Sequence, residues 1–163
     1  MTNLDEFLPY LMRRISTRIA EGIAQDLADI GLNHERWRVL AVLAEFGPQT
    51  LNKLARLVSI NVSTLSRLID RMNEEGLTLR EPSGEGRAVR ISIGPNGEAK
   101  LQQITPLIED IKLVASETLA PEELKRLQGD LRRLYSAYDR FAAARIAKHV
   151  ARREHALHDT DEA

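Results

Sequence analysis

The sequence predicts a mainly α-helical fold that contains one two-stranded β-hairpin, and three observations support this prediction. Aromatic residues make up only 4% of the 163 residues, so Leu, Ile, Val and Ala must build the core, and Gly and Pro are few. Apolar residues recur every three or four positions along much of the chain, which is the spacing of a helical face. Between Val89 and Ile93 the apolar period changes to two, which predicts a strand.

The first part of the chain is predicted to form two helices. An apolar stripe through residues 4–23 predicts one helix over about 5–30, and Gly31 ends it. Asn33 can cap a second helix, which ends at Gly47-Pro48. Both helices therefore have a sequence signal at their C-terminal end.

Two shorter helices and the hairpin follow. Thr50 can cap a helix over residues 51–58, and Asn61 can cap the next one. The strand at residues 89–93 finds a predicted partner in residues 77–80, across a segment rich in turn residues. The order of helix, short helix, tight turn, helix and hairpin is that of a winged helix-turn-helix.

Two long helices are predicted after the hairpin. Gly94-Pro95 opens the first, since proline fits the first turn of a helix. The second follows a break near Ala120-Pro121. It carries apolar residues at alternating spacings of three and four from Leu124 to Phe141. Such a heptad-like seam is typical of a helix that packs against a partner helix.

The turn between the two short helices supports the helix-turn-helix prediction at residue level. Ala55 is small where the helices must cross, Ser59 takes a turn position that Gly would fill best, and Leu65 is apolar where burial is needed. If this unit docks on DNA, the N-terminal part of its second helix enters the major groove. The candidate DNA contacts there are small hydrogen-bonding groups and one arginine: Asn61, Ser63, Thr64, Ser66 and Arg67.

Positive charge is concentrated in the same segment. The whole chain has a net charge of −1. Between residues 51 and 71, four basic residues oppose the single acid Asp70, a local charge of +3: Lys53, Arg56, Arg67 and Arg71. A phosphate backbone would lie against such a surface, so Lys53 and Arg71 join the candidate DNA contacts.

The sequence resembles the MarR family of winged helix-turn-helix transcriptional regulators from about Leu8 to about Phe141. The densest similarity runs through residues 54–72 and continues through residues 75–77 and 86–97. The resemblance implies a homodimer and a double-stranded DNA partner with a pseudo-palindromic operator. It also implies a repressor that a small aromatic or anionic ligand releases from DNA.

The resemblance also divides the chain. Residues 1–31 and 98–148 are expected to form a helical dimerisation region, and residues 32–97 a DNA-binding domain. Residues 149–163 are expected to be a polar tail that frays. The apolar stripes in the first and last predicted helices fit the dimerisation assignment.

Two further sets of site residues follow from the resemblance. In the family, an acid near the tip of the wing supports an arginine that reaches the minor groove, and Glu85-Gly86-Arg87 is the nearest match, which makes Arg87 a candidate DNA contact. Effectors bind near the dimer interface, where arginines can pair with a carboxylate and a Trp can stack on a ring. The candidates for this ligand site are Arg14, Arg18, His34 and Trp37.

Several classes of protein are not expected. The chain has no cysteine, which excludes disulfides and thiol chemistry. We find no catalytic motif, metal site or cofactor motif, so an enzyme is not expected. We find no apolar run long enough to cross a membrane and no secretory signal, which favours a cytoplasmic protein. The alternative is a winged-helix module that binds proteins, but such a module should expose apolar anchors where this chain has polar groups.

Overall fold

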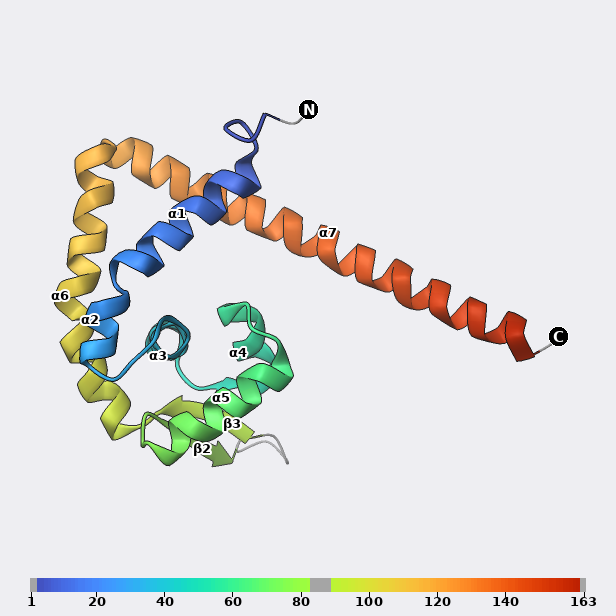
Figure 1. The fold of residues 1–163 in the computed structure, drawn as a ribbon, viewed down its shortest axis with the longest axis horizontal. Helices are drawn as coiled ribbons and strands as arrows, with labels where there is room; N and C mark the ends of the chain where they lie inside the picture. The colour runs from blue at the N-terminus through green and yellow to red at the C-terminus, as the bar shows by residue number, and fades with distance from the viewer. Residues whose placement is uncertain (1–2, 83–88, 162–163) are drawn as a thin grey trace. The chain divides into compact units, whose positions relative to one another are not determined.

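The computed structural model describes residues 3–82 and 89–161 (Figure 1). Contacts within the chain define two compact units, Met1–Ile111 and Lys112–Ala163, and the boundary falls inside the long helix α6 (Pro95–Thr118). The predicted fold, mainly helical with one hairpin, is confirmed. The first unit contains, before α6, α1 (Leu8–Gly22), α2 (Ala24–Asp29), α3 (His34–Phe46), β1 (Gln49–Thr50), α4 (Leu51–Val58), α5 (Val62–Glu74), β2 (Thr78–Pro82) and β3 (Val89–Ile93).

The three predicted N-terminal caps are confirmed. Asn33 Oδ1 accepts a hydrogen bond from the N–H three residues further on, at 2.9 Å, and Thr50 Oγ1 does the same at 3.4 Å. Asn61 Oδ1 accepts from the N–H two residues on, at 2.9 Å. A side-chain oxygen at this position satisfies a backbone donor that has no partner inside the helix.

The prediction of a single helix over residues 5–30 is wrong, because this segment forms two helices, α1 and α2. Ile23 leaves the helical path with φ −105° and ψ 0°, and its side chain is buried. Leu27 of α2 is fully buried, whereas α1 has no buried residue. The helix is therefore interrupted at the point where Ile23 and Leu27 enter the core. The apolar stripe in the sequence continues through this point, so it does not reveal the interruption.

The wing is an antiparallel sheet with the strand order β1-β3-β2. The predicted pairing of β2 with β3 is confirmed, with Thr78 opposite Ile93. The structure adds β1, whose Gln49 lies opposite Ile91. A strand of two residues has no readable period, so the sequence analysis missed it.

One apolar core joins most elements of the first unit. Ile23 and Leu27, which precede residue 32, and Ile104 of α6 belong to this core together with the winged-helix residues. The unit Met1–Ile111 therefore includes residues that we expected to fall into two regions. The core is aliphatic apart from one methionine, as composition predicted: Ile23, Leu27, Leu32, Val39, Leu40, Leu43, Leu54, Ala55, Val58, Leu65, Leu68, Ile69, Met72, Leu77, Ile91 and Ile104.

The second unit consists of the end of α6 and α7 (Pro121–Asp161). The carboxylate of Glu123 accepts a hydrogen bond from the Ala120 N–H at 2.9 Å, which caps the start of α7. In the structure α7 continues through residues 149–161, where we expected a fraying tail; Ala, Arg, Glu and Leu in this segment favour helix. Large apolar side chains are exposed along α7: Leu127, Tyr135, Tyr138, Phe141 and Ile146.

The turn between α4 and α5 contains the one non-glycine residue with a positive φ among the described residues. Ser59 has φ 51° and ψ 44°, which is left-handed helical geometry. This geometry lets the Ile60 N–H bond to the Ala55 carbonyl at 3.1 Å and end α4. The structure thus explains why glycine would suit this position better than serine.

We expect Ser59→Gly to raise the free energy of unfolding by about 0.5–1 kcal/mol, since glycine removes a left-handed penalty of about 1–2 kcal/mol and adds a smaller entropic cost. Denaturant unfolding measures this change. Ser116→Gly, the same replacement at an exposed position inside α6, is the control and should destabilise the protein by about 0.5 kcal/mol. A destabilised Ser59→Gly protein would contradict the strain argument.

Candidate nucleic-acid interface and effector residues

The two faces of α5 differ in the way a DNA-recognition helix requires. Its inner face is buried in the core through Leu65, Leu68, Ile69 and Met72. The side chains of five predicted contacts are exposed: Asn61, Ser63, Thr64, Arg67 and Arg71. Ser66, the sixth prediction on this helix, is half-buried and so presents less of its side chain.

Asn61 and Ser63 use part of their hydrogen-bonding capacity on each other. Asn61 Oδ1 accepts from both the backbone N–H of Ser63, at 2.9 Å, and its hydroxyl, at 2.7 Å. The amide NH₂ of Asn61 and the lone pairs of the Ser63 hydroxyl remain for an external partner. This pair can therefore donate from Asn61 and accept at Ser63, which suits hydrogen-bonding groups at base edges.

The basic side chains on α4 and α5 are available for an external anion. Lys53 is exposed, and within the described residues no recorded ion pair engages Lys53, Arg67 or Arg71. The only acid of this segment, Asp70, is paired with Arg80 of β2. Arg80 therefore neutralises the one negative charge in this segment that would repel a phosphate backbone. The same pair connects α5 with the wing.

The wing strands also carry a polar cross-strand contact. The Ser92 hydroxyl donates to the Glu81 carboxylate at 2.5 Å, which connects β3 with β2. Arg87, the predicted minor-groove residue, lies outside the described residues.

The four predicted effector residues form two separate pairs. His34 and Trp37 of α3 are in ring contact, with centroids 5.3 Å apart and planes inclined by 60°. His34 Nδ1 and Trp37 Nε1 are both buried and have no hydrogen-bond partner in the described structure. A buried polar atom without a hydrogen bond costs free energy, so a polar ligand atom that bonded to one of these nitrogens would bind favourably.

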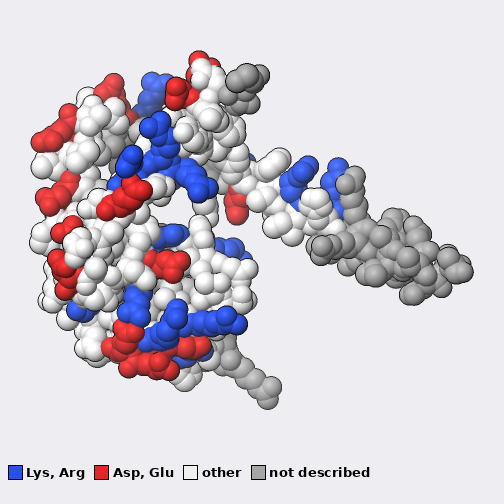
Figure 2. Space-filling view, viewed as in Figure 1, with Lys and Arg blue, Asp and Glu red and all other residues white. Residues whose placement is uncertain are grey.

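The other pair lies on α1, where Figure 2 shows a group of basic side chains. Arg14 and Arg18 lie along one face of α1 together with Leu11, Ile15 and Ile19, on open surface. Arg14 lies over the ring of Tyr10 at 5.7 Å, and Arg18 pairs with Glu21 at 2.9 Å. This face of α1 thus combines apolar surface with positive charge.

The sequence did not predict two ion pairs that attach α5 to other elements. Arg80 pairs with Asp70, and Arg36 of α3 pairs with Glu75, the residue that ends α5. The partners are 10 and 39 positions apart in sequence. Charge patterns along one helix do not identify such pairs, because their partners lie on different elements.

The described residues form neither a metal-ion cluster nor a helix that could span a membrane. No group of three or more His, Asp and Glu side chains there is arranged to hold a metal ion. No helix in the described ranges is both long and apolar enough to cross a membrane.

A tight turn between α4 and α5, a wing, and an exposed polar and basic face on α5 define a winged helix-turn-helix protein of the DNA-binding class. The profile of the MarR family matches residues 32–89. A crystal structure of a MarR family transcriptional regulator from Silicibacter pomeroyi DSS is 30% identical, with a TM-score of 0.76, over 82% of this chain and 91% of that chain. The chain belongs to the MarR family of transcriptional regulators.

Two relatives are repressors by name. HTH-type transcriptional repressor IacR of Pseudomonas putida is 26% identical over 124 residues, which is 76% of this chain and 74% of IacR. The homoprotocatechuate degradative operon repressor of Escherichia coli is 27% identical over 97 residues, which is 59% of this chain and 66% of that protein.

His34 predicts a pH dependence of stability. Burial lowers the pKa of His34 below its usual 6.5, and the nearby Arg38 lowers it further, against an opposing effect of Glu35. The unfolded chain therefore takes up a proton near pH 6.5 that the folded chain resists, so stability should fall as the pH drops through this value. Thermal melting between pH 7.5 and 5.5 measures the fall. It should be smaller in His34→Gln, whereas the control His149→Gln should behave as wild type; equal falls in all three would contradict the assignment.

Proposed function

We propose that this protein is a dimeric repressor that binds a pseudo-palindromic operator through α5 and the wing, and that a small anionic aromatic ligand releases it. The observation that carries the proposal is the outer face of α5, where exposed hydrogen-bonding groups lie beside arginines without an ion-pair partner in the described structure. Such a face suits base edges and phosphates together. Two recognition helices related by two-fold symmetry would contact half-sites about 10 bp apart.

The apolar side chains exposed on α7 support the proposed homodimer. Tyr138 and Phe141 have exposed fractions of 48% and 63%. Both belong to the heptad-like seam, and such an apolar seam is normally buried against a partner helix. We assign α1, the end of α6 and α7 to dimerisation in this proposal.

The proposed ligand class rests on the two pairs of effector residues. Arg14 and Arg18 supply positive charge beside apolar surface, and His34 and Trp37 supply rings with unsatisfied nitrogen atoms. Homoprotocatechuate, which gives one relative its name, is an aromatic carboxylate. An effector of this kind would shift DNA affinity only by its different affinity for the two states of the protein.

We also propose that the protein is cytoplasmic and has no enzymatic activity. The alternative of a protein-interaction module fits the outer face of α5 poorly, because the predicted contacts there are polar or basic and Val62 is the exposed large apolar residue of the helix.

A DNA-binding experiment tests the central claim. The wild-type protein is used to select a duplex from a random pool, and affinities are then measured by fluorescence anisotropy at several salt concentrations. We expect Arg67→Ala to bind the selected duplex roughly tenfold or more weakly, with a salt slope smaller by about one if Arg67 contacts a phosphate. Arg126→Ala, an exposed position on α7, is the control. Failure of the wild-type protein to enrich any duplex, or wild-type affinity in Arg67→Ala, would contradict the proposal.

The dimer is tested separately. Phe141→Asp places a charge in the exposed seam of α7 and should yield a folded monomer at micromolar concentration, because a buried unpaired carboxylate is strongly unfavourable. Light scattering gives the mass, and circular dichroism reports the helix content. Ala143→Asp, two residues further along the exposed helix and so on its opposite side, should remain dimeric. A dimeric Phe141→Asp protein would place the interface elsewhere.

A further inference from the structure

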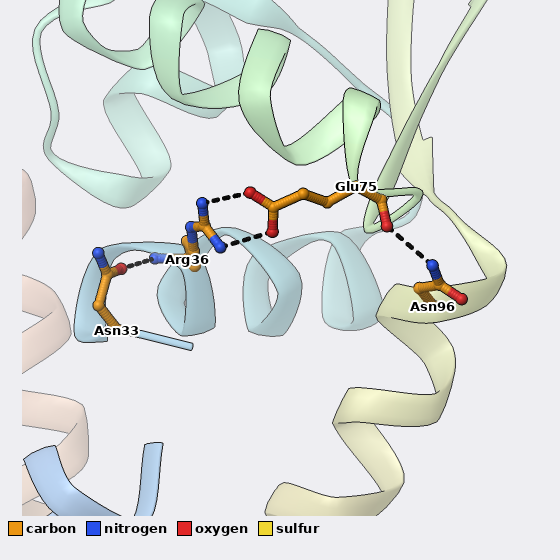
Figure 3. A network of polar contacts seen from close by, with 4 residues as sticks. All are labelled: Asn33, Arg36, Glu75 and Asn96. Atoms are coloured by element: carbon orange, nitrogen blue, oxygen red, sulfur yellow. Dashed lines mark hydrogen bonds and ion pairs between the residues drawn. The ribbon is translucent and has the colours of Figure 1, made fainter. Parts of the chain in front are cut away.

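Glu75 connects three elements at the C-terminal end of the recognition helix (Figure 3). Its carboxylate accepts two hydrogen bonds from the Arg36 guanidinium of α3, at 2.7 and 2.6 Å. Its backbone carbonyl accepts from the Asn96 amide of α6 at 2.8 Å. A bidentate arginine–carboxylate pair fixes both distance and orientation, which a single contact does not.

The two charges of this pair stand at unfavourable ends of their own helices. Arg36 is the third residue of α3, where the helix dipole favours a negative charge, and Glu75 follows the last residue of α5, where the dipole favours a positive charge. The stability of the individual helices therefore does not explain why a charged residue of this sign occupies either position. The contact between the two helices does explain both residues, since each charge neutralises the other.

The ion pair is also more than a solvated surface contact. The Arg36 side chain has an exposed fraction of only 18%, whereas that of Glu75 is 46%. Removal of the carboxylate would leave a largely buried guanidinium without its partner, which is costly.

We propose that Glu75 and Arg36 are positioning residues, which set the orientation of α5 against α3 for sequence-specific DNA binding. This inference rests on the proposed function. The α5 helix has 13 residues and so is about 20 Å long at about 1.5 Å per residue. A rotation of about 10° at its C-terminal end moves the N-terminal side chains by about 3 Å, more than the tolerance of a hydrogen bond.

A test of this role can exploit the opposite signs of two effects. Glu75→Gln removes one negative charge beside the proposed DNA surface, so a purely electrostatic role predicts tighter binding to every duplex. A positioning role predicts weaker binding to the selected duplex and unchanged or tighter binding to random DNA. We expect the ratio of the two affinities to fall about tenfold, within the range of coupling seen between residues in contact.

Three further variants complete the experiment. Glu74→Gln makes the same charge change one residue earlier, at an exposed side chain, and should leave the ratio unchanged. Arg36→Lys retains the charge but not the paired geometry and should lower the ratio, even if Glu75→Gln folds poorly. The exchange Arg36→Glu with Glu75→Arg puts both charges at favourable helix ends and should restore the ratio relative to either single replacement. An unchanged ratio in Glu75→Gln and Arg36→Lys, or an equal fall in Glu74→Gln, would overturn the inference.

A distance measurement separates this inference from the proposed function. Because the chain has no cysteine, Glu45→Cys on α3 and Thr64→Cys on α5 accept spin labels selectively. Labelled chains diluted with unlabelled ones give the distance distribution between the two helices without DNA. We expect Glu75→Gln to broaden or shift this distribution and Glu74→Gln to leave it unchanged. An unaltered distribution in Glu75→Gln would overturn the positioning role whether or not the protein binds an operator.

Discussion

The close backbone contact between the end of α5 and the start of α6 is the constraint on which the first unit depends. The Gly94 N–H donates to the Leu77 carbonyl at 2.9 Å, and the Asn96 N–H donates to the Gly76 carbonyl at 3.1 Å. A Cβ atom on Gly94 would lie 2.3 Å from the Gly76 oxygen, and one on Gly97 would lie 2.2 Å from the Leu77 oxygen. Side chains at these positions would separate the two segments, so glycine is what allows α5, β2 and α6 to meet at one point.

That junction places the proposed DNA surface and the proposed effector residues on one connected framework. Trp37 and His34 lie at the start of α3, beside Arg36, which reaches Glu75 at the end of α5. A ligand that moved the first turn of α3 would act on α5 through the Arg36–Glu75 pair. Coupling by this route needs two discrete arrangements of the pair, one for each state of the protein, because a ligand shifts only an equilibrium that already exists.

Local chemistry explains which parts of this structure the sequence revealed. The caps at Asn33, Thr50 and Asn61 act within three residues, so residue type and position sufficed to predict them. The break at Ile23 depends on burial against distant elements, and the apolar stripe runs through it unchanged. The exposed face of α5 was predicted except for the partial burial of Ser66, but the Arg36–Glu75 pair, 39 positions apart, was not. Helix-dipole rules would have argued against both of its charges.

Ion pairs attach α5 to its neighbouring elements on two sides. Asp70 and Arg80 connect the helix to the wing, and Glu75 and Arg36 connect it to α3. Salt screens exposed pairs, and the Asp70–Arg80 pair is half exposed, with fractions of 55% and 41%. Raising the salt concentration would therefore weaken the attraction to phosphates and at the same time loosen the attachment of α5 to the wing. The slope of log affinity against log salt concentration therefore contains both counterion release and the weakening of the Asp70–Arg80 pair. The number of phosphate contacts must instead be taken from the difference in slope between single-arginine variants and the wild type.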